Sequence, residues 1–243
     1  VWLSGESGSI FKSTDRGLTW TQLASGTDVM IDAISFADPD HGWASSVQRK
    51  LLHSSDGGST WTEQKIDAFL PITTVRARSA QECWVAGYHG LLMRTLDGGQ
   101  SWRVISPDLT RNDPSRLGSS GGLSKDNLGV EYGCTLFAIA ESPLEAGVVW
   151  AGSNDGLVHL SRDGGKTWAN VTPPQLPAWA TLSMIDPSRH ESGRCYIAVD
   201  GHQENIRDPY LFKTADYGAT WTNVGGGLPA RHPVHVLAAD STN

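Results

Sequence analysis

The sequence is poor in cysteine, in basic residues and in long apolar runs, and each shortage removes a class of protein. Three cysteines in 243 residues are too few for a disulfide scaffold. Acidic residues outnumber basic ones by 26 to 19, which argues against a nucleic-acid partner. No run of 18 apolar residues and no signal peptide occurs, so membrane insertion is not expected.

The sequence also contains no motif that binds a reactive cofactor. No phosphate-binding loop, nucleophile elbow or dinucleotide fingerprint occurs, and no His-x-His or Glu-x-x-His pairing suggests a metal. Cys83, Cys134 and Cys195 are expected to be small buried apolar side chains. We therefore expect neither a cofactor nor a metal.

What the sequence does contain is one eight-residue motif in five copies, which we call the box. It reads Ser/Thr-x-Asp-x-Gly-x-Ser/Thr-Trp, as in Ser161 to Trp168. The Asp and Trp positions of the five copies are Asp15 and Trp20, Asp56 and Trp61, Asp97 and Trp102, Asp163 and Trp168, and Asp216 and Trp221. A second aromatic, Trp2, Trp43, Trp84, Trp150 or Tyr196, precedes each box. A motif that recurs along a chain in this way is typical of stacked structural repeats.

Each period predicts four short antiparallel strands. In residues 30–66 these are Ile31 to Phe36, Gly42 to Ser46, Lys50 to Ser54 and Thr60 to Gln64. Four strands every 40-odd residues indicate an all-β propeller in a single domain. The predicted blades are residues 1–24 completed by 233–238, then 30–66, 72–105, 134–171 and 180–224, with an insertion at 106–133.

Two arrangements of these blades stay open. The strand expected at Pro233 to Ala238 would supply the first strand that blade one lacks, closing a ring of five. Alternatively, the chain is an open or excised piece of a parent with six to ten blades. The first residue is Val1, not methionine, which favours a processed or excised piece.

The box itself is interpreted as a structural turn between the third and fourth strands. Its Ser/Thr and Asp side chains are expected to accept hydrogen bonds from turn N–H groups. Its glycine supplies a left-handed backbone, and its Trp is expected to pack back between blades. Five carboxylates on five separate turns cannot converge on one substrate.

Function is expected where the repeat is interrupted. Residues 106–133 and 200–208 are insertions in connections that leave one face of a blade, and Trp179 belongs to no repeat position. We expect them to rim one mouth of the ring, opposite the boxes. The candidate ligand-face residues are Tyr88, His89, Arg111, Tyr132, Trp179, His202, Glu204 and Arg207.

The same loops hold acids that a hydrolase needs. Glycoside hydrolysis uses two carboxyl groups roughly 5 to 10 Å apart. The candidates are Asp108, Asp126, Glu131, Asp155, Asp200 and Asp208. No spacing singles out a pair, and each acid also reads as a solvated or turn-forming loop residue.

The five boxes match the Asp-box (BNR) repeat, so the chain resembles that superfamily over nearly its whole length. The superfamily includes sialidases, xyloglucan-active endoglucanases, sortilin-type receptor domains and photosystem II assembly factors. Phe36 to Ala44 and Gly90 to Gly99 resemble the assembly-factor type. Residues from Trp102 to Leu157 resemble bacterial sortilin-like proteins labelled glycosyl hydrolases, which implies an exported protein and a longer parent.

The resemblance implies a fold and no catalytic site. No Arg-Ile-Pro occurs, which speaks against sialidase chemistry, and the glycine-rich opening of the xyloglucan enzymes is also missing. The leading hypothesis is a non-catalytic module that holds a protein segment or a glycan on the loop face. The alternatives are a glycoside hydrolase, or part of one, and a scaffold piece of a larger assembly.

Overall fold

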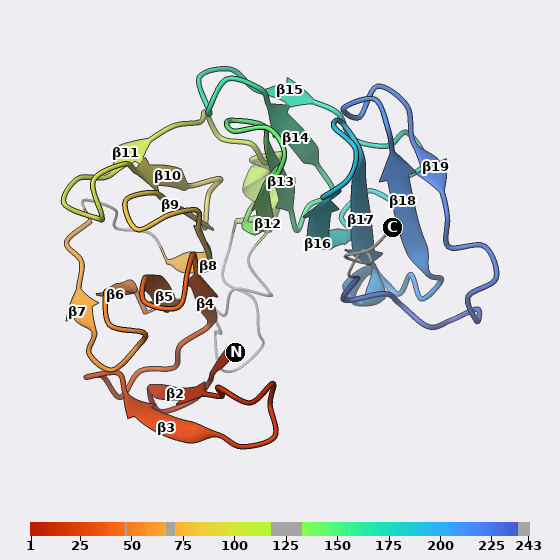
Figure 1. The fold of residues 1–243 in the computed structure, drawn as a ribbon. Helices are drawn as coiled ribbons and strands as arrows, with labels where there is room; N and C mark the ends of the chain where they lie inside the picture. Colours follow the sequence, from red (N-terminus) through yellow and green to blue (C-terminus); the bar gives the residue numbers. More distant parts are fainter. Residues whose placement is uncertain (47, 67–70, 118–132, 238–243) are drawn as a thin grey trace. The chain divides into compact units, whose positions relative to one another are not determined.

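The structure, a computed structural model, describes residues 1–46, 48–66, 71–117 and 133–237 (Figure 1). The chain forms two compact units, residues 1–105 and 106–243, and each is described by itself. The candidates Asp126, Glu131 and Tyr132 lie outside the described residues.

Unit 1 contains three antiparallel sheets. The first has the order β1-β2-β3 (Trp2–Ser4, Ser9–Lys12, Thr21–Ala24). The second has the order β4-β5-β6-β7 (Ala33–Phe36, Gly42–Ser46, Lys50–Ser54, Thr62–Glu63). The third pairs β8 to β11 in chain order (Ile72–Ala77, Cys83–Gly87, Leu92–Thr95, Arg103–Val104). Each is a meander.

Unit 2 contains two more four-stranded meanders. The first comprises β12 to β15 (Leu136–Glu141, Val149–Ser153, Val158–Ser161, Ala169–Asn170). The second comprises β16 to β19 (Thr181–Pro187, Cys195–Asp200, Tyr210–Thr214, Thr222–Asn223). The helical elements of the described residues are two single 3-10 turns, η1 (Pro114–Arg116) and η2 (His202–Glu204). The all-β prediction with four-stranded antiparallel blades is confirmed, and the first sheet lacks a first strand as expected.

The cores lie between neighbouring sheets. One cluster joins Trp43 and Leu51 to Val75 and Val85 of the next sheet, and another joins Trp150 to Ile197 and Phe212. The second strands β5, β9 and β13 are buried at all five positions. Apolar burial between sheets is therefore the main stabilising contact of each unit.

All five boxes form the predicted turn with the same hydrogen bonds. In the box of β14 and β15, Ser161 Oγ accepts from Gly165 N at 2.8 Å, and Asp163 Oδ1 accepts from Thr167 N at 2.9 Å. The box glycines Gly17, Gly58, Gly99, Gly165 and Gly218 have φ between 82° and 91°. The hydroxyls of Thr60, Ser101 and Thr167 donate to the box carboxylates, as do the backbone N–H groups of the same residues. Because these bonds stabilise the ionised form, they lower the pKa of Asp56, Asp97 and Asp163 to about 2.

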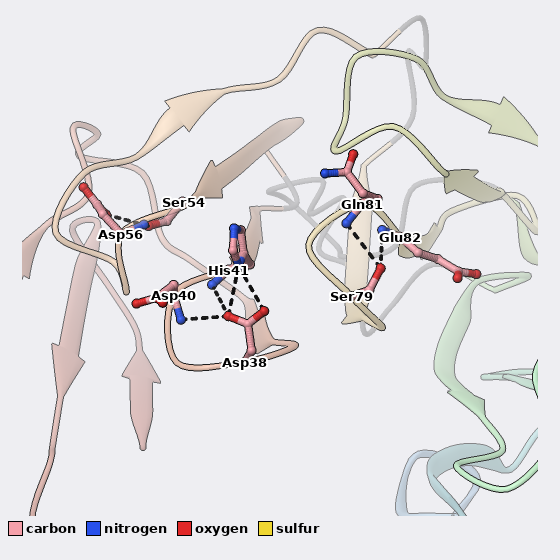
Figure 2. A network of polar contacts seen from close by, with 8 residues as sticks. All are labelled: Asp38, Asp40, His41, Ser54, Asp56, Ser79, Gln81 and Glu82. Atoms are coloured by element: carbon pink, nitrogen blue, oxygen red, sulfur yellow. Dashed lines mark hydrogen bonds and ion pairs between the residues drawn. The ribbon is translucent and has the colours of Figure 1, made fainter.

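A second turn, between the first and second strands, is tied to the box. Asp38 Oδ1 accepts from the N–H groups of Asp40 and His41, both at 2.8 Å, and Ser79 Oγ plays this role in the next sheet (Figure 2). Gly57 N of the box then donates to Asp40 O at 2.8 Å. The same link recurs in three other sheets: Gly98 N donates to Gln81 O, Gly164 N to Gly147 O, and Tyr217 N to Gly193 O.

A third repeated feature escaped the sequence interpretation. The residue immediately before the box lies opposite the second-strand aromatic, and it is Lys12, His53, Arg94, Leu160 or Lys213. The three Lys and Arg residues among them lie over the ring, at 5.3 Å for Lys12 and Trp2, 4.6 Å for Arg94 and Trp84, and 5.9 Å for Lys213 and Tyr196. Cation–π contact therefore joins the second and third strands.

Two expectations are wrong, one about a strand and one about a tryptophan side chain. Residues 233–237 form no strand: Pro233 has no N–H to donate, Val234 O accepts from Ser183 Oγ at 3.3 Å, and Leu237 N faces Met184 Sδ at 3.5 Å. Trp20 is 39% exposed rather than packed between sheets. It directly precedes β3 of the first sheet, whereas Trp61, Trp102 and Trp221 pack on inter-sheet cores.

The cysteine interpretation is confirmed. Cys83, Cys134 and Cys195 are free and buried. Burial raises the pKa of the Cys83 and Cys195 thiols well above the ordinary value. These thiols are therefore protonated apolar groups at neutral pH.

Candidate functional site

In unit 2, two loops meet at the turn that follows β13. Asp155 lies in this turn and is 0% exposed. Its Oδ2 accepts from Arg111 N at 2.7 Å, and its Oδ1 accepts from Ser153 Oγ. Its main-chain oxygen accepts from Arg111 Nε at 2.7 Å and from Trp179 N at 3.3 Å. One residue thus connects the loop after residue 106 to the loop that carries Trp179.

Trp179 is held in an unusual backbone conformation beneath two guanidinium groups. Its φ is 66°, a left-handed value that non-glycine residues rarely adopt. Arg111 Cζ lies 5.6 Å and Arg116 Cζ 4.5 Å from its ring centroid. Strained conformations of this kind persist where the surroundings fix them, and they concentrate at functional sites.

The two 3-10 turns extend this arrangement. Asp113 caps η1, accepting from Ser115 N at 2.9 Å, and η1 presents Arg116. Arg116 Nη1 contacts Glu204 Oε1 of η2 at 2.8 Å. Arg111, Arg116, Asp155, Trp179 and Glu204 therefore form one connected group, which we call the Trp179 cluster.

Asp200 anchors the other end of η2. It is 8% exposed, and its Oδ1 accepts from His202 N at 3.0 Å. Its Oδ2 lies 2.6 Å from His202 Nδ1 and 3.2 Å from His235 Nδ1. His235 belongs to the segment that lies along β16. A carboxylate with two imidazole partners fixes η2, and through it Glu204.

The remaining candidates are placed as follows. Asp108 is exposed and accepts from Thr110 N and Oγ1, a local turn. Arg207 and Asp208 are exposed beyond η2. His89 has a φ of 52° in the turn after β9, and Tyr88 is only 4% exposed. A side chain as buried as Tyr88 presents little surface to a ligand.

Asp155, a predicted catalytic candidate, is placed inside the protein. Its side chain is fully buried and both oxygens accept hydrogen bonds within the protein, so it has no free oxygen for a substrate. Two members of the site were missed. Arg116 lies inside the insertion that the spacing identified, and His235 was assigned to a strand. Their role depends on three-dimensional contacts that no spacing reveals.

The described ranges contain neither a candidate metal site nor a membrane-spanning helix. No group of three or more His, Cys, Asp or Glu side chains is arranged to hold a metal ion there. No helix of that part of the chain has the length and apolar character to cross a bilayer. An open hollow of about 570 Å³ lies in unit 1 beside Gly8, Lys50 and residues 22–28, and none of its lining residues is a predicted site residue.

Comparison with known proteins places the chain among β-propellers. Residues 19–121, less than half of the chain, match the family model of the photosystem II assembly factor YCF48, which confirms the resemblance seen in the first hundred residues. No curated protein matches the sequence.

Three solved structures illustrate the likeness. The GH74 xyloglucanase from Xanthomonas campestris is 14% identical with a TM-score of 0.66, over 94% of this chain and 36% of that one. The WD40 repeats of RRP9 are 11% identical with a TM-score of 0.62, over 92% and 61%. A YCF48 bound to a D1 peptide is 19% identical with a TM-score of 0.45, over 94% and 78%. Since WD40 repeats build propeller blades, the fold of this chain is of the β-propeller type.

Proposed function

We propose that this chain is a non-catalytic propeller module that binds a protein segment through the Trp179 cluster. The observation that carries the proposal is the Trp179 ring, fixed in a left-handed backbone beneath Arg111 and Arg116. Trp and Arg are the residues on which binding energy most often depends in protein interfaces. The match to an assembly-factor model over residues 19–121 favours a protein partner over a glycan.

The chemistry of the acids supports binding over hydrolysis. Asp155 is buried, Asp200 faces two imidazoles and Glu204 faces Arg116. An acid–base pair needs one carboxyl group that donates a proton and another that stays free to act on the sugar or water. The likeness to a GH74 xyloglucanase is one of fold and does not transfer its activity.

The proposal also concerns the location of the protein and the arrangement of its sheets in a complete propeller. We infer an exported protein whose five sheets are blades of one propeller, closed as a ring of five or continued in a larger parent. A crystal structure that shows no packing between the first and fifth sheets would exclude the ring. A reporter fusion of the full gene product that stays in the cytoplasm would contradict export.

The test uses peptides selected from a random phage library on the wild-type protein. Trp179→Ala and Arg111→Ala should each weaken the selected peptides at least tenfold, because truncating a central aromatic or arginine anchor typically costs about 2 kcal/mol or more. Trp20→Ala is the matched control, since Trp20 is also a partly exposed tryptophan, and it should leave affinity unchanged.

Two results would overturn the proposal. One is a set of selected peptides that bind the Trp179 and Arg111 variants as tightly as the wild type. The other is release of reducing sugar from a panel of β-glucans that is abolished by Asp200→Asn, which would assign the chain to the hydrolases.

A further inference from the structure

Asp155 makes an unusual number of contacts to the two residues that the proposed site presents. Its carboxylate accepts the backbone N–H of Arg111, and its main-chain oxygen accepts the Nε–H of the same residue and the N–H of Trp179. Arg111 is thereby held at two atoms and Trp179 at one. The buried residue Asp155 therefore holds both Arg111 and Trp179 by hydrogen bonds.

The negative charge of Asp155 makes this arrangement specific. A buried carboxylate is costly unless hydrogen bonds or an opposite charge compensate it. Here the compensation comes from Arg111 N–H, from the Ser153 hydroxyl and from the guanidinium that bonds to the neighbouring main-chain oxygen. A displaced Arg111 would remove the backbone donor of Asp155 Oδ2 and leave the Ser153 hydroxyl on Oδ1, so the buried carboxylate favours the observed position of Arg111.

The Trp179 loop packs closely against the turn at Gly156. Gly156 has a φ of 84°, and a Cβ at this residue would lie 3.1 Å from both Pro177 O and Trp179 N. A side chain at Gly156 would therefore press on the loop, and its positive φ also favours glycine. Close packing from below and a bond to Asp155 together maintain the left-handed φ of Trp179.

We infer that Asp155 is a positioning residue: it sets the orientation of Arg111 relative to the Trp179 ring and so prepares the surface before a ligand arrives. The inference rests on the proposed function, and it adds that the affinity of the site depends on a carboxylate that no ligand touches. Preorganisation of this kind strengthens binding because less ordering is lost on association.

The first test is a double-mutant cycle read with a phage-selected peptide as the probe. Asp155→Asn should weaken the peptide about tenfold, and Trp179→Ala at least tenfold. The double variant should bind more tightly than the product of the two single effects predicts, because Asp155 acts by positioning Arg111 and the ring together. Asp163→Asn is the matched control: it changes a hydrogen-bonded box carboxylate of the same sheet and should leave affinity unchanged.

The second test needs no peptide. The fluorescence of Trp179 is obtained by subtracting the emission measured with Trp179→Phe from the emission measured with Trp179 present. Acrylamide should quench this fluorescence at least twofold more efficiently in Asp155→Asn than in Asp163→Asn. Arg111→Lys, which keeps the charge but loses the Nε–H, should show the same increase. This exposed substitution keeps the test informative if Asp155→Asn does not fold.

The outcomes are distinct. Additive effects in the cycle, or unchanged quenching in both Asp155→Asn and Arg111→Lys, would overturn the positioning role. If no selected peptide depends on Trp179, the proposed function fails. In that case quenching alone decides whether Asp155 positions the ring.

Discussion

His53 shows at the scale of one residue how the repeat tolerates chemical variation. It occupies the position before the box where Lys12, Arg94 and Lys213 are cations, and its ring lies 4.4 Å from that of Trp43. Its Nε2 is buried without a hydrogen-bond partner among the described residues. Burial, with a smaller effect of His41, lowers the pKa of His53. A neutral imidazole thus replaces a cation.

The lowered pKa predicts a loss of stability in mild acid. Because the folded pKa lies below the unfolded value of about 6.5, the unfolded chain binds the proton more readily. The contribution of His53 is therefore complete above about pH 6.5 and is lost as the pH falls through the folded pKa. His53→Leu, which copies Leu160 of another repeat, should reduce the loss between pH 7.5 and 5.0, measured by urea denaturation.

His159 provides the comparison for this measurement. Burial lowers its pKa too, so it contributes a loss of the same sign in unit 2. His53→Leu should leave that part of the pH dependence in place. An unchanged total loss would show that His53 is not held neutral.

At the scale of the element, the box hairpins depend on a left-handed glycine. Gly218, between β18 and β19, has a φ of 82°, and a Cβ there would lie 2.7 Å from Val171 Cβ. Gly218→Ala should therefore destabilise the protein by about 1–3 kcal/mol through backbone strain and the clash.

Thermal unfolding followed by circular dichroism measures this effect. Gly226→Ala is the matched control, since Gly226 has no atom within 4 Å of a Cβ and no positive φ. An equal Tm for the Gly218 and Gly226 variants would contradict the requirement for glycine in the box.

Strand pairing also shows what the sequence could and could not reveal. Gly42–Ser46 and Lys50–Ser54 were predicted residue for residue, because burial and turn chemistry both repeat. The predicted strand from Thr60 to Gln64 is shortened to Thr62–Glu63, because Thr60 N–H donates to Asp56 instead of to a strand. The left-handed backbone of Trp179 has no sequence signal, and Asp155-Gly156 reads as an ordinary turn.

At the scale of the molecule, the two units have separate apolar cores. Phe212 is fully buried in the core of unit 2. Phe212→Ala should cost about 3–5 kcal/mol through lost contacts and a cavity. Amide hydrogen exchange should show the loss of protection in β12 to β19 and not in the sheets of unit 1. An equal loss in both units would show that they unfold as one.

The repeat count predicted the number of sheets, since each box brings its own hairpin. The composition of the insertion did not predict which of its residues would meet Trp179. Arg111 and Arg116 are five residues apart. Asp155 holds Arg111, and the Asp113 cap of η1 and Glu204 hold Arg116, so both guanidinium groups reach the ring. Long-range contacts of this kind have no period and so leave no pattern in a single sequence.

The short span of the box hydrogen bonds has a consequence for how the chain folds. The bonds of Ser161 and Asp163 reach residues two or four positions away, so closing the turn costs little chain entropy. Hairpins of this kind form in about 1–10 μs. Five hairpins can therefore form independently of one another, and the slow step is the later joining of the first strands and the cores between sheets.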